Sequence, residues 1–271
     1  MTATLTPSQM SSLKMLRADT GVEDLGADPA KTIAAVDARY KESSARVMFT
    51  MLKKVYPDNA AFIAQAKERA KVARVAMLSQ EPTATQVAAH IPWETIIAWR
   101  DSDEFKALPI QTRFLVGIYT YLPPQRIDYT PMRVVGRLPK VMEAGMNYVV
   151  IAKKSAKFVF HAYKTSKIFG DITHVVPKPL FDLLCEYLGD RRTGYLFQAG
   201  DVPITEVALG KRLRTIFIAK FDKVFGANNL RHSYITHQNK GVPSIVAMKE
   251  DAAAMAHSVI THQSYRHISL E

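Results

Sequence analysis

The fold class of this chain is decided by two stretches, Asn147-Tyr148-Val149-Val150-Ile151-Ala152 and Lys157-Phe158-Val159-Phe160-His161-Ala162-Tyr163. Both are rich in β-branched and aromatic residues, which favour extended strands. The polar run Lys153-Lys154-Ser155-Ala156 separates them and predicts a turn. The segment Thr173–Val176 adds a third short strand. Together these segments predict a small antiparallel sheet.

Helical patterns flank these strands on both sides in the sequence. Thr6-Pro7 and Asp28-Pro29 each place a capping side chain directly before a proline, which is typical of a helix start. The order of helices, strands and helices predicts an α+β fold that is mostly helical. We expect further helices at 43–55, 58–78, 92–102, 109–121, 179–188, 205–221, 230–238 and 243–256.

A break in the helical pattern at Glu81-Pro82-Thr83-Ala84-Thr85 marks a candidate linker. It predicts a small all-helical domain at residues 1–80, followed by an α+β domain with the small antiparallel sheet at residues 81–271. Two domains of this kind on a basic chain suggest a protein that closes around a duplex.

The charge balance is strongly basic. The 271 residues include 36 Lys and Arg against 25 Asp and Glu, a formal net charge of +11, which suits nucleic acid as a partner. Four basic residues of the expected helix 58–78 either face phosphates or form a solvated helix face. They are Lys67, Arg69, Lys71 and Arg74.

Cys185 is the only cysteine, so neither a disulfide framework nor a four-cysteine zinc site is expected. Its apolar neighbours predict a buried side chain, and a lone cysteine suits a reducing compartment. We find no secretory signal and no apolar run of transmembrane length, so we expect an intracellular protein without a membrane partner.

Metal and nucleotide cofactors are not expected either. His257, His262 and His267 are spaced by five residues, so they do not share one helix face. There is no His-Glu-x-x-His pattern and no glycine-rich phosphate loop. The expected chemistry therefore uses neither a metal ion nor ATP.

The C-terminal region places an arginine, a histidine and a tyrosine in that order. They lie in Leu230-Arg231-His232-Ser233-Tyr234, in Met255-Ala256-His257-Ser258 and in Gln263-Ser264-Tyr265-Arg266-His267. A tyrosine hydroxyl can attack a phosphodiester only where cations and hydrogen-bond donors neutralise the phosphorane that forms. With Arg126 and Lys164 earlier in the chain, this order resembles the tyrosine recombinases, the phage-integrase family, from about residue 85 to the end.

The resemblance implies roles for the earlier two residues. Arg126 matches the family's first arginine, whose guanidinium would hold the scissile phosphate with two parallel hydrogen bonds. Arg133 is a rival for this position. Lys164, at the end of a strand, matches the lysine that protonates the leaving 5′ oxygen, and Lys167 is its rival.

The resemblance also implies roles for the C-terminal residues. Arg231 matches the second arginine, His257 the donor to a non-bridging phosphate oxygen, and Tyr265 the nucleophile. Asn228 stands where the family usually has a histidine, three residues before the arginine. An asparagine donates hydrogen bonds but exchanges no proton at neutral pH, so the general-base role lacks its usual residue.

The implied function is site-specific DNA recombination or integration through a 3′-phosphotyrosyl intermediate, without a cofactor. The implied partners are double-stranded DNA, with Lys153, Lys154 and Lys167 as further contacts, and three more copies of the chain in a tetramer. Such a protein would act in the cytoplasm or nucleus, or be encoded by a virus or phage. Three alternatives stay open: a type IB topoisomerase, an inactive DNA-binding or structural protein of the same fold, which Asn228 favours, and a basic RNA-binding protein.

Overall fold

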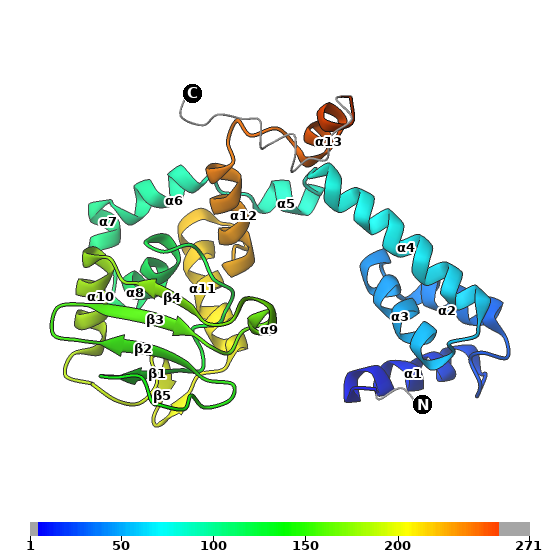
Figure 1. Ribbon diagram of the computed structural model, residues 1–271, viewed down its shortest axis with the longest axis horizontal. Coiled ribbons are helices and arrows are strands. Elements are labelled where there is room, and N and C mark those ends of the chain that lie inside the picture. The colour runs from blue at the N-terminus through cyan, green and yellow to red at the C-terminus, as the bar shows by residue number, and fades with distance from the viewer. Residues whose placement is uncertain (1–4, 255–271) are drawn as a thin grey trace. The chain divides into compact units, whose positions relative to one another are not determined.

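The computed structural model describes residues 5–254 of the chain (Figure 1). The expected site residues His257 and Tyr265 lie outside the described residues. The described residues divide into two compact units, one formed by residues 5–81 with 243–254 and the other by Pro82–Val242. We call them the first and second units.

The first unit is helical in its described part. Its core packs around Leu16, Phe49, Leu52 and Phe62, all fully buried. The expected starts at Thr6 and Asp28 are confirmed, because both side chains accept a hydrogen bond from a backbone N–H in the first turn. Its helices are α1 (Pro7–Thr20), α2 (Pro29–Arg39), α3 (Glu42–Val55), α4 (Ala60–Ser79) and α13 (Ile245–Ala254).

The last described helix, α13, packs on α4. At its start, the backbone N–H of Ile245 donates a hydrogen bond of 2.8 Å to Oε1 of Gln80. The contacts therefore assign this helix to the first unit, whereas the expected division placed all of residues 81–271 together. In the expected linker, Thr83 caps a short helix that already begins at Ala84.

The second unit combines helices with a four-stranded sheet in the order β1-β2-β3-β4. Five of its helices confirm the expected ones within a few residues. They are α6 (Trp93–Arg100), α8 (Ile110–Thr120), α10 (Lys178–Leu188), α11 (Glu206–Phe221) and α12 (Ala227–Gln238). Three short helices were not expected: α5 (Ala84–Ala89), α7 (Asp103–Lys106) and α9 (Ser166–Phe169). The strands are β1 (Met132–Val135), β2 (Asn147–Ile151), β3 (Ala156–Phe160), β4 (Ile172–Val175) and the separate pair β5 (Gln198–Ala199) and β6 (Val202–Pro203).

The expectation of a wholly antiparallel sheet is wrong. β2, β3 and β4 are antiparallel, but β1 pairs with β2 in parallel, with Met132 opposite Asn147. The reason is the connection 136–146, which carries the chain back so that β2 runs in the same direction as β1. Leu138 and Met142 of this connection pack on Tyr148 and Val159 and cover one face of the sheet.

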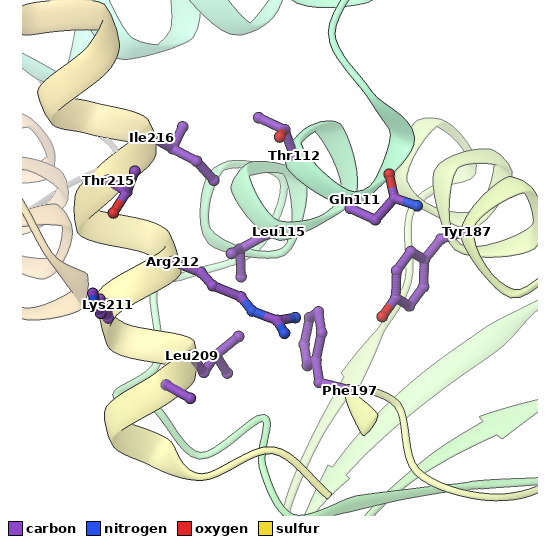
Figure 2. Close-up of a pocket in the computed structure, with 11 residues that line it drawn as sticks. Gln111, Thr112, Leu115, Tyr187, Phe197, Leu209, Lys211, Arg212, Thr215 and Ile216 are labelled. Atoms are coloured by element: carbon purple, nitrogen blue, oxygen red, sulfur yellow. The ribbon is translucent and has the colours of Figure 1, made fainter. Parts of the chain in front are cut away.

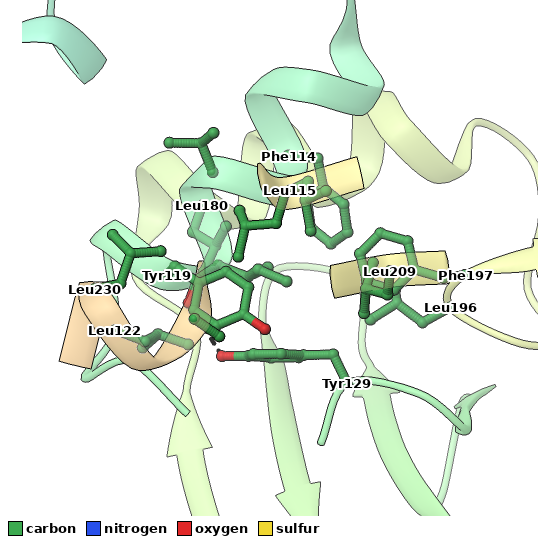
Figure 3. Packing of buried hydrophobic residues seen from close by; sticks show 14 of the residues in the cluster. Phe114, Leu115, Tyr119, Leu122, Tyr129, Leu180, Leu196, Phe197, Leu209 and Leu230 are labelled. Atoms are coloured by element: carbon green, nitrogen blue, oxygen red, sulfur yellow. Dashed lines mark hydrogen bonds between the residues drawn. The ribbon is translucent and has the colours of Figure 1, made fainter. Parts of the chain in front are cut away.

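The other face of the sheet packs against α8, α10 and α11 in the main core (Figures 1 and 3). Tyr119 of α8 and Tyr129 of the following loop meet edge to face, with ring centroids 5.3 Å apart. Both side chains are fully buried, and Figure 3 shows them together beneath Leu115 of α8. Aromatic pairs of this geometry contribute beyond the area that they bury.

Cys185 is exposed, contrary to the expectation of a buried side chain. The helix α10 buries Leu180, Leu184 and Leu188, which recur at intervals of four along one face. Cys185 follows Leu184 by one residue and therefore points away from that face.

Candidate functional site

The loop after α8 carries Arg126 and is anchored by two buried tyrosines. Tyr119 Oη donates a hydrogen bond of 2.9 Å to the carbonyl oxygen of Arg126. Tyr129 Oη donates one of 3.0 Å to the carbonyl oxygen of Ile118. The Arg126 side chain is exposed and makes no hydrogen bond or ion pair with another described residue. The loop backbone is thus held in place while the guanidinium is free to bind a ligand.

Arg231 of α12 lies close to the same loop, at Asp128. Burial raises the pKa of the Asp128 carboxyl, and the charges of Arg126 and Arg231 oppose this rise. Burial lowers the pKa of Arg231, the charge of Arg126 lowers it further, and Asp128 opposes both. This mutual influence requires the three groups to lie near one another. The structure therefore brings together two arginines that are far apart in the sequence.

Helix α12 is held against the residues that precede and begin α6. Ser233 Oγ donates a hydrogen bond of 2.6 Å to the carbonyl oxygen of Ile91, and both residues are buried. Tyr234 packs edge to face on Trp93, with ring centroids 5.2 Å apart. These contacts lie within one turn of Arg231, so they fix the position of its backbone.

Asn228 lies in the first turn of α12, because the helix begins at Ala227, three residues before the expected start. The helix start is capped by Asn229, whose Oδ1 accepts a hydrogen bond of 3.1 Å from the backbone N–H of Gly226. Asn228 is exposed and makes no side-chain hydrogen bond with another described residue. Residues three apart lie on neighbouring parts of a helix face, so Asn228 and Arg231 can serve one ligand.

Lys164 lies in the connection between β3 and β4, where the sequence predicted it. The connection is closed by Tyr163 Oη, which donates a hydrogen bond of 2.7 Å to the carbonyl oxygen of Gly170. Lys164 and its rival Lys167 are both exposed, and neither is paired with another described residue. The geometry leaves both lysines as candidates for the residue that protonates the leaving 5′ oxygen.

Asn147 was missed as a site residue by the sequence analysis, although it links the two candidate segments. Its Nδ2 donates hydrogen bonds of 2.7 Å and 3.0 Å to the carbonyl oxygens of Asp128 and Ala162. Its Oδ1 accepts hydrogen bonds of 2.8 Å from the backbone N–H groups of His161 and Ala162. This buried side chain thus joins the loop of Arg126 to the connection that carries Lys164.

His174 of β4 was also missed. Its Nε2 lies 3.0 Å from Nε2 of Gln125, the residue before Arg126. Burial lowers the pKa of His174 below its usual value, which favours the neutral imidazole. A neutral ring nitrogen can accept the hydrogen bond of the Gln125 amide, so this pair adds a second tie between β4 and the Arg126 loop.

Two basic residues singled out in the sequence are occupied by other contacts. Arg133, the rival of Arg126, pairs with Glu143 at 3.1 Å and lies 5.0 Å from the centroid of the Tyr195 ring. Arg69 pairs with Asp37 at 2.6 Å and with Glu42, and is mostly buried. Their guanidinium groups are therefore already bound within the protein.

The remaining predicted DNA contacts are exposed. Lys67, Lys71 and Arg74 lie on α4 of the first unit. Lys153 and Lys154 lie in the turn between β2 and β3 of the second unit. Each is available to a polyanion on its own unit.

A separate hollow of about 440 Å³ lies between α8, α10 and α11 (Figure 2). Leu115, Phe197 and Leu209 form much of its apolar lining, and the Arg212 side chain extends toward Tyr187 and Phe197. None of the predicted site residues within the described part of the chain lines it.

In the described part of the chain, no group of three or more His, Cys, Asp or Glu side chains is placed to hold a metal ion. No helix of the same part has the length and apolar character needed to cross a membrane. Comparison with models of protein families and with curated proteins finds no match for this chain.

Proposed function

We propose that this protein breaks and rejoins double-stranded DNA as a site-specific tyrosine recombinase, with Tyr265 as the nucleophile. The observation that carries the proposal is the convergence of Arg126 and Arg231 beside Asp128. Both arginines follow from the family resemblance alone, and both keep their guanidinium groups free of hydrogen bonds to other described residues. Two free guanidinium groups held together suit one phosphate.

In the proposed reaction, the Tyr265 oxygen attacks the scissile phosphorus and forms a 3′-phosphotyrosyl bond as the bond to the 5′ oxygen breaks. Arg126, Arg231 and His257 stabilise the negative charge of the phosphorane. Lys164 gives its proton to the leaving 5′ oxygen. A 5′ hydroxyl of another strand then reverses these steps, and no cofactor is needed because the covalent link keeps the energy of the phosphodiester.

The phenol proton of Tyr265 has to leave to a group other than Asn228, because an amide accepts no proton at neutral pH. This observation favours a second candidate function, a DNA-binding protein of the same fold without strand-cleaving activity. Both functions require DNA binding, to which Lys67, Lys71 and Arg74 would contribute in the first unit and Lys153, Lys154 and Lys167 in the second. They differ only in whether a covalent adduct forms.

Covalent trapping separates the two functions. The protein is incubated with nicked duplexes of many sequences, boiled in detergent and separated by electrophoresis. A protein–DNA band that Tyr265→Phe abolishes and Tyr234→Phe retains would support strand cleavage. Tyr234 serves as the control because its ring packs on Trp93. Salt-dependent DNA binding without an adduct on any duplex would favour the inactive DNA-binding protein.

Assembly then separates a recombinase from a topoisomerase. A recombinase is expected to form a tetramer with two duplexes, and a type IB topoisomerase is expected to relax supercoiled DNA as a monomer. Sedimentation of the trapped adduct measures which of the two assemblies forms.

A further inference from the structure

Arg214 of α11 is an exposed arginine that none of the family motifs covers. It makes no hydrogen bond, ion pair or ring contact with another described residue. The neighbours of its side chain show which part of the surface of the second unit it covers.

Two glycines lie beside the Arg214 side chain. A Cβ atom at Gly226 would lie 3.5 Å from Arg214 Cγ, and one at Gly210 would lie 3.7 Å from Arg214 Nη1. The same position at Gly210 is 3.8 Å from Cδ1 of Ile127. The stem of Arg214 therefore passes Gly226, and its guanidinium lies over Gly210 next to Ile127. A side chain larger than alanine at either glycine would occupy this space.

These neighbours place Arg214 at the candidate site. Ile127 stands between Arg126 and Asp128 in the loop, and Gly226 directly precedes the first turn of α12. Asp128 influences Arg126 and Arg231, whereas no described carboxylate lies within ion-pair distance of Arg214. The positive charge of Arg214 is thus uncompensated within the described part of the protein.

We propose that Arg214 binds a backbone phosphate of DNA beside the phosphate that Arg126 and Arg231 hold. A guanidinium carries five N–H donors in a planar fork that matches the oxygens of a phosphate, and none of the five is bonded to another residue of 5–254. The free N–H groups of the first turn of α12 add partial positive charge beside the same stem. This inference rests on DNA as the partner in the proposed function.

The salt dependence of binding tests the proposal without any catalytic step. Affinity for a fluorescent 30-base-pair duplex is measured by anisotropy over a range of salt concentrations, with wild type, Arg214→Gln, Arg214→Lys and Arg212→Gln. Arg212 is the matched control, since it is an exposed arginine two residues away that points to the opposite side of α11, into the hollow of Figure 2.

Loss of one phosphate contact lowers the slope of log affinity against log salt by about 0.9. We expect this change for Arg214→Gln. Arg214→Lys should retain the wild-type slope because it keeps the charge, and Arg212→Gln should also leave the slope unchanged. An unchanged slope in Arg214→Gln would overturn the proposal, and so would an equal loss in Arg212→Gln. Melting curves within about 2 °C of wild type would show that the variants fold.

The salt-dependence result for Arg214 can be distinguished from the outcome of the trapping assay that tests the recombinase proposal. If the wild type binds duplex DNA and Arg214→Gln lowers the slope while no adduct forms in the trapping assay, Arg214 is a phosphate contact of an inactive DNA-binding protein. If the wild type binds no duplex DNA at any salt concentration, the inference about Arg214 is overturned together with DNA as the partner.

Discussion

Ser233 donates a hydrogen bond of 2.6 Å to the carbonyl oxygen of Ile91, a residue 142 positions earlier in the chain. This bond joins the helix of Arg231 to the chain just before α6. Because both groups are buried, Ser233→Ala leaves the Ile91 carbonyl without a partner and should cost about 1–3 kcal/mol of unfolding free energy. Urea denaturation measures the loss. Ser155→Ala, in an exposed turn, serves as the control. An equal effect of the two changes would contradict a stabilising role of the hydrogen bond between Ser233 and Ile91.

Asn147 should matter for both stability and chemistry. Asn147→Ala removes the partner of two backbone carbonyls and two backbone N–H groups, so we expect a loss of about 2–4 kcal/mol of unfolding free energy. It also frees the Arg126 loop from the connection of Lys164, so the yield of covalent adduct should fall under conditions where the variant is still folded. Gln238→Ala, at an exposed position without a side-chain hydrogen bond to another described residue, should change neither quantity.

The partly buried Asp128 should lower stability at neutral pH. Burial raises its folded-state pKa above the usual 3.8, so its contribution to stability is present at low pH and is lost as the pH rises through the folded-state pKa. We therefore expect Asp128→Asn to melt no lower than wild type at pH 7 and to show a weaker pH dependence above pH 3.8. Thermal denaturation over this range is the measurement. A lower melting temperature of the variant at pH 7 would show that attraction to the charges of Arg126 and Arg231 outweighs desolvation.

His174 should produce the opposite pH dependence. Its folded-state pKa lies below the usual 6.5, so its contribution to stability is complete above pH 6.5 and is lost as the pH falls through the folded-state pKa. His174→Gln keeps a hydrogen-bonding group beside Gln125 but does not titrate. The drop in melting temperature between pH 7.5 and pH 5 should therefore be smaller in this variant than in wild type or in the exposed control His232→Gln.

Arg126 and its rival Arg133 should differ sharply in the trapping assay. Removing a group that stabilises transition-state charge typically costs about 10²–10³ in rate, and we expect a loss of this size for Arg126→Gln. Arg133→Gln should leave the rate of adduct formation nearly unchanged, because its guanidinium is paired with Glu143. Single-turnover kinetics with a nicked duplex measures the rate of adduct formation by each variant. A larger loss for Arg133→Gln than for Arg126→Gln would show that Arg133 has the role proposed for Arg126.

Local sequence patterns were sufficient to predict those helix starts and strands that depend only on neighbouring residues. The helix starts at Pro7 and Pro29 follow from a capping side chain next to a proline, and these features act within one turn. The strands β2 and β3 likewise follow from β-branched and aromatic residues on either side of a polar turn. The mostly helical α+β composition could be read in this way.

Other features depend on residues that are distant in the sequence. The parallel pairing of β1 with β2 depends on the path of the connection 136–146, and strand propensity carries no information on direction. The exposure of Cys185 depends on which face of α10 the core covers. The occupied state of Arg69 depends on Asp37 and Glu42, which lie on two other helices.

The sequence by itself determined the order and chemical types of the candidate site residues, since a motif is a local arrangement of side chains. Only the tertiary structure decided that Arg126 and Arg231 lie together at Asp128, that Asn147 joins two segments of the site and that Arg214 lies beside them. The physical reason is that packing of the sheet against α8, α10 and α11 sets these distances, and packing depends on the whole core of the second unit.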